Sequence, residues 1–230
     1  MAPKPHYVAA YGALVRSLRR NFTLDEAMSR AVGGDYEGMG RRLRAIVEYA
    51  GLKDGMALVD IGCGSGRLST ALSQPAMRID YLGTDIVKPL LKYAQSRASS
   101  AFAFRHHTEL SLPVPSASVD MCCAFSVFTH LRHEETFLYL QDGARALRPG
   151  GTFVFSFLEF AAPGHWNVFD NAVEGVRHKR PGHLDVFIER NALALFAERL
   201  GYQLVEFVDG SAAPWGGEPI GQSTAILRKA

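Results

Sequence analysis

Hydrophobic residues recur at helical spacing through the first fifty residues of the chain. Three segments, residues 7–20, 23–32 and 39–50, place their apolar side chains three and four positions apart, which is typical of amphipathic helices. Thr23 and Glu26 have the spacing of a capping box at the start of the second segment, and Gly51 follows the third where a helix C-cap is expected. We therefore predict an N-terminal helical segment over residues 1–50.

Short apolar runs alternate with helical stretches from residue 56 onward, which is typical of a parallel sheet with crossover helices. The pattern predicts strands at residues 56–61, 79–84, 102–105, 119–127, 152–157, 202–208 and 223–228. It predicts helices at residues 68–72, 90–98, 134–147 and 191–200. Helices on both faces of such a sheet make an α/β fold, a three-layer αβα sandwich.

One long segment interrupts this alternation. Residues 161–183 are rich in Gly, Pro, His and Asn, so we expect a loop without regular secondary structure there. The predicted organisation is a helical lid at residues 1–50 and a core at residues 51–230 that carries a loop-rich lid insertion at about residues 161–190.

Composition narrows the classes of function. The 230 residues are 47% hydrophobic, enough for a sizeable core, and 25 basic against 23 acidic side chains give a net charge of only +2. Nucleic-acid binding by counterion release usually needs a larger basic surplus, so nucleic acid is not favoured as a partner. No run approaches the roughly 18 apolar residues of a membrane span, and the first residues lack the apolar core of a signal peptide. We expect a soluble, cytoplasmic protein with no membrane partner.

The cysteines, Cys63, Cys122 and Cys123, form neither a disulfide framework nor a spacing suited to zinc. Cys122 and Cys123 are neighbours on a predicted strand, so their side chains should point to opposite faces of the sheet. We expect buried thiols in a reducing compartment, and no metal.

The strongest motif is Leu58-Val-Asp-Ile-Gly-Cys-Gly-Ser-Gly-Arg67, in which an apolar strand runs directly into three alternating glycines and then a helix. Gly62, Gly64 and Gly66 let the backbone approach a ligand closely, and the start of the following helix is expected to present free N–H groups to an anion. A dinucleotide-binding fingerprint would have its last glycine where Arg67 stands. This spacing disfavours a nucleotide-dependent oxidoreductase and suits a nucleoside amino acid.

The stretch Val59-Asp-Ile-Gly-Cys-Gly-Ser-Gly66 resembles the first motif of the class I S-adenosylmethionine-dependent methyltransferases. The resemblance implies S-adenosylmethionine as cofactor and S-adenosylhomocysteine as product. It implies that Asp60 lies near the ammonium of the methionine moiety, and that the carboxylate meets the loop formed by Gly62, Cys63, Gly64 and Gly66.

A second segment supports the same resemblance. Leu147-Arg-Pro-Gly-Gly151 resembles the turn that precedes the fifth strand in these methyltransferases. Together with the antiparallel pair expected near the C-terminus, it implies a Rossmann-like, seven-stranded, mostly parallel sheet with an antiparallel last strand.

Asp85 is the next candidate for binding the cofactor. It ends the second predicted strand at the offset of a ribose-binding acid, and Ile86 follows it as a further contact. Because Pro89 favours the first position of a helix, Lys88 is expected to cap that helix. The Asp85 carboxylate would then be free to accept hydrogen bonds from the ribose hydroxyls.

Other cofactor contacts follow from the resemblance. Counting back from Leu112-Pro113, the acid that the family uses for the adenine amino group falls on Thr108, with Glu109 beside it. Phe125 ends the fourth predicted strand, where similar enzymes place the sulfonium. Tyr36 precedes the core in a segment similar to one in a bacterial branch of the family, and there it is expected to cover the cofactor.

His130 lies just after the fourth predicted strand, at the sheet edge where ligands of open α/β sheets bind. It is either a general base near the methyl acceptor or a histidine that caps and packs the following helix. In the predicted lid, His165 and Trp166 are candidates for binding the acceptor, together with Phe160 and Phe169. The lid histidines lack the compact spacing of zinc ligands.

The predicted function is methyl transfer to a small-molecule acceptor, and the resemblance favours an oxygen. Phe125-Ser-Val-Phe stands where enzymes that methylate amino groups of bases in nucleic acids have an Asn-Pro-Pro-Tyr segment. Two rival functions stay open: a module that binds S-adenosylmethionine without transferring the methyl group, and the nucleotide-dependent oxidoreductase. An acceptor pocket would favour the enzyme over the binding module.

Overall fold

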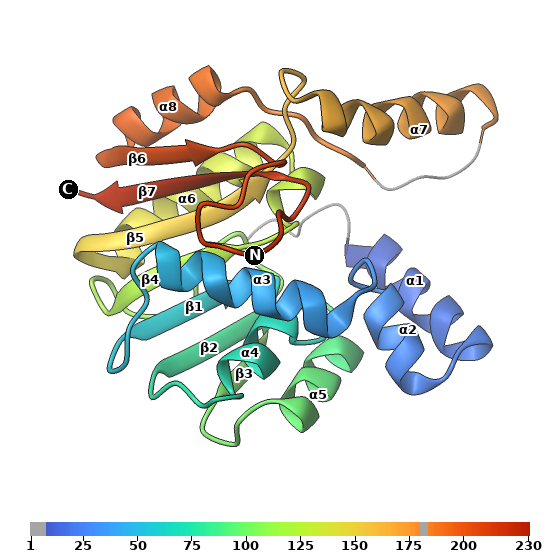
Figure 1. Ribbon diagram of the computed structural model, residues 1–230, viewed down its shortest axis with the longest axis horizontal. Coiled ribbons are helices and arrows are strands. Elements are labelled where there is room, and N and C mark those ends of the chain that lie inside the picture. Colours follow the sequence, from blue (N-terminus) through green and yellow to red (C-terminus); the bar gives the residue numbers. More distant parts are fainter. Residues whose placement is uncertain (1–7, 180–183) are drawn as a thin grey trace.

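The structure is a computed structural model that describes residues 8–179 and 184–230 (Figure 1). Its helices are α1 (Val8–Asn21), α2 (Leu24–Arg30), α3 (Tyr36–Tyr49), α4 (Arg67–Leu72), α5 (Lys88–Arg97), α6 (His133–Ala146), α7 (Trp166–Arg177) and α8 (Arg190–Arg199), with 3₁₀ helices η1 (Phe128–His130) and η2 (Pro163–His165). Its strands are β1 (Ala57–Ile61), β2 (Asp80–Asp85), β3 (Ala103–His106), β4 (Val119–Ala124), β5 (Leu147–Phe157), β6 (Tyr202–Val208) and β7 (Ser223–Lys229). Residue 7 of the first predicted helix and residues 180–183 of the predicted loop lie outside the described residues.

The described strands form one seven-stranded sheet in the order β3-β2-β1-β4-β5-β7-β6. Neighbours among β1 to β5 run parallel, and Val59 of β1 stands beside Leu82 of β2 and Cys122 of β4. β7 lies antiparallel between β5 and β6. This topology confirms the predicted α/β fold with a mostly parallel, Rossmann-like sheet and an antiparallel last strand. The strand order reverses between β1 and β4, where open sheets of this kind form a ligand crevice.

Helices cover both faces of the sheet because the central strands are apolar on both sides. Leu58 and Cys123 pack with α3 and α4 on one face, whereas Val59 and Cys122 pack with α6 and α8 on the other. In Figure 1, α3 lies in front of the sheet and α6 behind it. The neighbouring cysteines therefore point to opposite faces as predicted, and the thiols of all three cysteines are buried and free of disulfides.

A separate apolar cluster joins the N-terminal helices to the core. Val15 of α1 and Met28 of α2 are buried in contact with the same cluster as Tyr93 of α5. The predicted capping box is present at α2, where the Thr23 side chain accepts from the Glu26 N–H and the Glu26 side chain accepts from the Thr23 N–H. Because α5 follows β2, this packing carries α1 to the C-terminal edge of the sheet.

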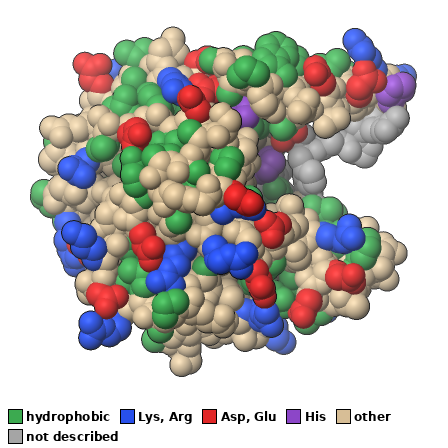
Figure 2. Space-filling view, in the orientation of Figure 1, with side chains coloured by type: hydrophobic (Ala, Val, Ile, Leu, Met, Phe, Trp, Pro, Cys, Tyr) green, Lys and Arg blue, Asp and Glu red, His purple; other side chains and the backbone are tan. Residues whose placement is uncertain are grey.

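Regular structure occupies most of the predicted loop at residues 161–183, so that part of the prediction is wrong. Averaged over the whole segment, the composition resembles that of a loop, but residues 166–177 contain no proline and a single glycine. Phe169 and Val173 are half-buried on one side of α7 at helical spacing. α7 extends beyond the sheet (Figure 1), and the surface is hollowed between it and the α1–α2 pair (Figure 2).

The chain leaves β4 earlier than predicted. β4 ends at Ala124 and not at residue 127, because Ser126 adopts a φ of 55° and turns the backbone away from the sheet. The Ser126 N–H donates to Ser156 Oγ at 2.7 Å, which stabilises this turn. The chain then forms η1, so His130 stands on a short helix past the strand end and not on the strand itself.

Candidate active site

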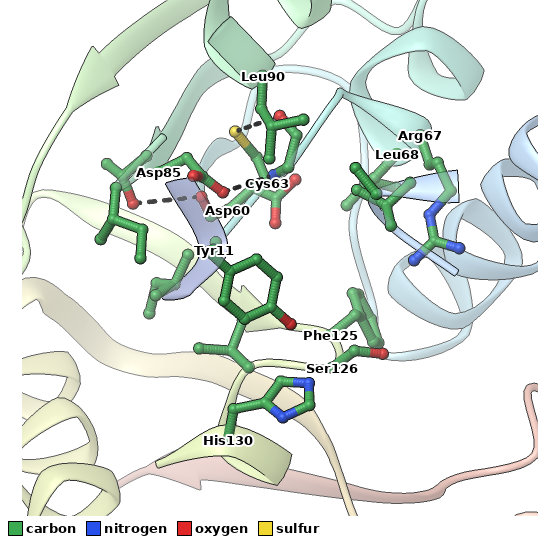
Figure 3. A pocket seen from close by; sticks show the side chains of 18 of the residues that line it. Tyr11, Asp60, Cys63, Arg67, Leu68, Asp85, Leu90, Phe125, Ser126 and His130 are labelled. Atoms are coloured by element: carbon green, nitrogen blue, oxygen red, sulfur yellow. Dashed lines mark hydrogen bonds between the residues drawn. The ribbon is translucent and has the colours of Figure 1, made fainter. Parts of the chain in front are cut away.

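A cavity of about 440 Å³ lies at the C-terminal edge of β1, β2 and β4 (Figure 3). This is the edge at which ligands of open α/β sheets bind. Its walls come from the glycine loop after β1, the ends of β2 and β4, η1 and the N-terminal helix α1. Its lining includes Tyr11, Asp60, Gly62, Cys63, Gly64, Arg67, Asp85, Ile86, His107, Phe125, His130, Tyr139 and Gln222.

The glycine loop approaches its neighbours too closely for side chains. A Cβ on Gly62 would lie 2.5 Å from Val127 Cγ2, and the residue has a φ of +64°. Gly62, Cys63 and Gly64, which the sequence marks as candidate cofactor contacts, line the cavity. Gly66 is not part of the lining, because it faces α5, where an added Cβ would lie 2.7 Å from the Ala94 Cβ. Gly66 therefore serves helix packing.

The loop uses several of its own N–H groups within the protein. The Cys63 N–H donates to the Thr84 carbonyl at 2.9 Å, and the Gly66 N–H donates to the Cys63 carbonyl at 3.0 Å. The Gly64 N–H donates to Asp85 Oδ2 at 3.0 Å. These three donors of the loop are therefore engaged within the protein, and α4 begins after them at Arg67.

Asp85 stabilises the edge of the site. Its Oδ2 accepts from Gly64, and its Oδ1 accepts from the Val87 N–H at 2.7 Å. Val87 caps α5, and Lys88 is the first residue of that helix, which corrects the predicted cap. The Asp85 carboxylate is thus not free, although it lines the cavity beside Ile86. Burial raises its pKa to about 6, and the backbone hydrogen bonds oppose that rise.

Asp60 is a buried acid in the wall of the cavity, with only 3% of its surface exposed. Its Oδ2 accepts from the Tyr81 hydroxyl at 2.7 Å, and its Oδ1 accepts from the Cys123 thiol at 3.5 Å. Burial raises its pKa to about 7, although both hydrogen bonds favour the carboxylate. A cation bound in the cavity would favour ionisation of this acid.

The structure does not bring Thr108 and Glu109 to the cavity lining. Glu109 is exposed, and its backbone carbonyl accepts from the Tyr139 hydroxyl at 3.2 Å. His107 lines the cavity in their place, since its N–H donates to the Asp85 carbonyl at 3.1 Å and extends the end of β2. The residue that lines the cavity here therefore precedes the two that counting along the chain selected.

Tyr36 also lies outside the cavity lining. Its hydroxyl donates to the Ser65 carbonyl at 2.7 Å and lies 3.0 Å from Thr70 Oγ1, so it braces the outer side of the glycine loop. The aromatic residue that faces the cavity is Tyr11 of α1. Burial raises the pKa of Tyr11 to about 12, and the nearby carboxylates of Asp85 and Asp185 contribute to the rise.

Phe125 and His130, two further candidates from the sequence, line the side of the cavity at the end of β4. His130 Nδ1 lies 2.9 Å from the Leu184 carbonyl oxygen and 3.7 Å from Asp185 Oδ1. The Tyr11 ring meets the His130 ring edge-on with centroids 5.7 Å apart, and both side chains reach into the pocket in Figure 3. Helix α1 and the segment after α7 therefore meet at this histidine.

Comparisons with known proteins place this geometry in a family. A family model described as a methyltransferase domain matches residues 59–155. A protein of Mycolicibacterium smegmatis named as a probable S-adenosylmethionine-dependent methyltransferase is 31% identical over 102 residues, which are 44% of this chain and 38% of that protein. The ubiquinone biosynthesis O-methyltransferase of a Methylobacterium species is 31% identical over 102 residues, 43% of this chain and 39% of that protein. The chain spans about two fifths of the length of these curated relatives.

A solved structure shares the fold over nearly the whole chain. The magnesium protoporphyrin IX methyltransferase of Synechocystis with bound S-adenosylhomocysteine superposes with a TM-score of 0.66 at 16% identity, covering 98% of this chain and 97% of that one. Residues 59–155 form a class I S-adenosylmethionine-dependent methyltransferase domain. S-adenosylmethionine is the cofactor of this domain.

The lining of the methyltransferase domain fits that cofactor. S-adenosylmethionine is an elongated molecule with a nucleoside at one end and a charged amino acid at the other. Asp85 offers carboxylate acceptors on one side of the cavity, Asp60 offers an acid near the glycine loop, and Arg67 offers a cation across from Asp85 (Figure 3). Acceptors for hydroxyls and complementary charges for an amino acid are therefore present together.

Three residues in the wall of the methyltransferase cavity have no motif that marks them in the sequence. Tyr11 lies on a predicted helix, but its spacing shows only that one face of that helix is apolar. His107 directly precedes the predicted adenine contacts, and this position in the sequence is the only feature that could have indicated it. Gln222 precedes β7, and its Oε1 accepts from the Ser156 hydroxyl at 2.7 Å.

His165 and Trp166, predicted to bind the acceptor, are not brought to the cavity of the methyltransferase domain. His165 is buried beside Glu159, whose N–H lies 3.0 Å from His165 Nδ1. The Trp166 indole N–H donates to the Phe160 carbonyl at 2.9 Å. Trp166, Phe160, Phe169 and Phe187 pack against one another, and the rings of Phe160 and Phe187 stack with centroids 4.4 Å apart. These aromatic residues attach α7 to the core.

The described residues contain neither a cluster suited to a metal ion nor a helix suited to cross a membrane. Within residues 8–179 and 184–230, no group of three or more His, Cys, Asp and Glu side chains is placed to hold a metal ion. The helices in this part of the chain are also too short or too polar to cross a membrane.

Proposed function

We propose that this chain transfers a methyl group from S-adenosylmethionine to a hydroxyl oxygen of a small molecule held beside His130. The observation that carries the proposal is the hydrogen bond at His130 Nδ1. The Leu184 carbonyl, 2.9 Å away, can only accept, so Nδ1 carries the proton in the neutral imidazole. Nε2 then carries the lone pair, which is the form that a general base needs.

Two neighbours support a proton-accepting role for His130. The Asp185 carboxylate lies 3.7 Å from Nδ1, and its negative charge stabilises the imidazolium that forms when Nε2 accepts a proton. The Tyr11 ring packs against the imidazole from the side of α1 and restricts its orientation. His130 is also only one fifth exposed, with a side-chain accessibility of 21%, so solvent competes little with an acceptor molecule.

The cofactor assignments in this proposal follow the lining of the cavity. Bound S-adenosylmethionine supplies an electrophilic methyl group on its sulfonium. Asp85 accepts from the ribose hydroxyls, because a carboxylate has about four lone-pair sites and the two backbone bonds use only two. Asp60 faces the ammonium, while Ile86 and His107 flank the nucleoside. Phe125 stands at the methyl-transfer side.

Several features support a small hydroxyl compound as the acceptor. The cavity volume of about 440 Å³ lies in the range of small-molecule sites, and Phe125, Val127 and Tyr139 give its acceptor side an apolar wall. The Methylobacterium relative is named as an O-methyltransferase. An alcohol or phenol needs to lose its proton as its oxygen attacks, and a base in the wall meets this need. A module that only binds the cofactor would have no use for such a base.

The proposal is tested by incubating the protein with S-adenosylmethionine and a library of small hydroxyl compounds, and by following products heavier by one methylene with mass spectrometry. His130→Gln should lower kcat by about 10²- to 10⁴-fold and leave S-adenosylhomocysteine affinity unchanged. His133→Gln is the matched control, because His133 Nε2 bonds the Phe187 carbonyl of the same segment at 2.9 Å but does not line the cavity. Equal kcat for the His130→Gln variant and the unaltered protein at every pH would refute the base.

A further inference from the structure

Arg67 places a cation in the cavity without a carboxylate partner from the protein. It is the first residue of α4, half-buried, and it stands across the pocket from Asp85 (Figure 3). Its Nη1 donates to the Gly34 carbonyl over a long 3.5 Å, and no carboxylate oxygen of the described residues lies within 4.0 Å of its guanidinium. A guanidinium has five N–H donors, and Arg67 lines the cavity with one of them on the Gly34 carbonyl.

A cation withdrawn from water needs an anion nearby. Burial lowers the pKa of Arg67 to about 10, and the more distant groups that oppose this are Tyr36, Asp35 and Asp60. Asp35 already pairs with Arg42 at 3.0 Å. Asp60 already accepts from Tyr81 and Cys123. The anion that complements Arg67 must therefore come from a ligand.

Three backbone donors of the glycine loop, the N–H groups of Cys63, Gly64 and Gly66, are engaged within the protein. The other arginine in the described lining, Arg30, holds its guanidinium 4.2 Å from the centroid of the Phe22 ring. Among these groups, Arg67 is the one that combines a full charge with donors open to the cavity.

We propose that Arg67 binds the α-carboxylate of the methionine moiety of S-adenosylmethionine. The inference rests on the cofactor assignment and on the proposed placement of the ribose at Asp85 and of the ammonium at Asp60. An elongated molecule laid from Asp85 past Asp60 ends on the side of the cavity where Arg67 stands (Figure 3). The planar guanidinium suits a carboxylate because it can donate two parallel hydrogen bonds.

The experiment compares two ligands that differ by the amino acid. Isothermal titration measures the affinity of S-adenosylhomocysteine and of 5′-methylthioadenosine, which keeps the nucleoside and the sulfur but has no carboxylate. Arg67→Met should weaken the binding of S-adenosylhomocysteine about 10- to 100-fold and leave the affinity for 5′-methylthioadenosine unchanged. Arg67→Lys, which keeps the charge without the planar fork, should fall between the unaltered protein and Arg67→Met. Arg41→Met, on the exposed side of α3 and outside the cavity lining, is the control.

Two further readouts keep the outcome clear. The melting temperature of Arg67→Met without ligand should not fall, because removing an unpaired buried charge removes its desolvation cost. Equal losses for both ligands would show a general distortion of the site and overturn the proposal. Unchanged S-adenosylhomocysteine affinity with a raised KM for a methyl acceptor would assign the anion to the acceptor and overturn it too. If the unaltered protein bound neither ligand, the cofactor assignment would fail and the proposal with it, whereas failure of the hydroxyl acceptor would leave it standing.

Discussion

Removing the Asp85 carboxylate should destabilise the protein before any cofactor is bound. Asp85 is 9% exposed and accepts the Gly64 N–H at 3.0 Å and the Val87 N–H at 2.7 Å. A hydrogen bond to a charged group contributes about 1.5–3 kcal/mol, so the two bonds together contribute about 3–6 kcal/mol. Burial of the charge, which raises the Asp85 pKa to about 6, offsets part of that. We expect Asp85→Ala to lower the free energy of unfolding by about 2–4 kcal/mol.

Urea denaturation without ligand measures this loss. Asp85→Asn should lie between Asp85→Ala and the unaltered protein, because its single carbonyl oxygen can keep one of the two N–H groups while its amide group opposes the other. Asp80→Ala is the matched control, since Asp80 begins the same strand, β2, and is exposed. Asp142 would be a poor control, because its carboxylate accepts from the Leu112 N–H at 2.6 Å and pairs with Arg145.

Cofactor affinity completes the test. Asp85→Ala should also weaken the binding of S-adenosylhomocysteine, but the loss of stability must appear in the ligand-free protein. An Asp85→Ala variant whose free energy of unfolding matched that of Asp80→Ala within about 0.5 kcal/mol would refute the structural role. It would show that the carboxylate is free for the ribose, as the position of Pro89 alone suggested.

Two other variants probe the core and its buried acid. Burial raises the pKa of Asp60 from its ordinary 3.8 to about 7, so in that pH window the folded protein holds a proton that the unfolded chain releases, and stability falls as the pH rises. Asp60→Asn should flatten this slope in thermal unfolding between those pH values, and an unchanged slope would contradict the assignment. Gly143→Ala, whose Cβ would lie 2.5 Å from Phe153 Cε1, should cost about 1–3 kcal/mol in urea unfolding with S-adenosylhomocysteine affinity intact. A variant as stable as the unaltered protein would show that α6 can shift.

Much of the fold could be predicted because its determinants are local. The alternation of apolar strands with helical stretches predicted the sheet, and strand β7 was expected to be antiparallel before its neighbours were known. The capping box at Thr23 and Glu26 formed because its partners are three residues apart. The helix α7 was missed because composition was averaged over a segment that also contains its glycine- and proline-rich flanks.

Residues of the candidate site could be predicted only where the residues of a sequence motif themselves line the cavity. Gly62, Cys63 and Gly64 follow β1 directly, and their spacing placed them in the cavity wall. The position of Tyr36 depends on how the N-terminal helices are arranged, which the sequence does not show. These helices pack on α5, and Tyr11, not Tyr36, lines the cavity.

The sequence by itself determined the alternation of strands and helices that makes the central sheet, the glycine loop and the family that this loop indicates. These features are set by side-chain periodicity and by backbone freedom over a few consecutive residues. Tertiary packing decided that Asp85 accepts two backbone N–H groups, that the Leu184 carbonyl lies 2.9 Å from His130 Nδ1, and that Arg67 lines the cavity without a carboxylate partner from the described protein. Each of these features joins atoms from segments that are far apart in the chain. Such atoms come together and lose their water only once the core has folded.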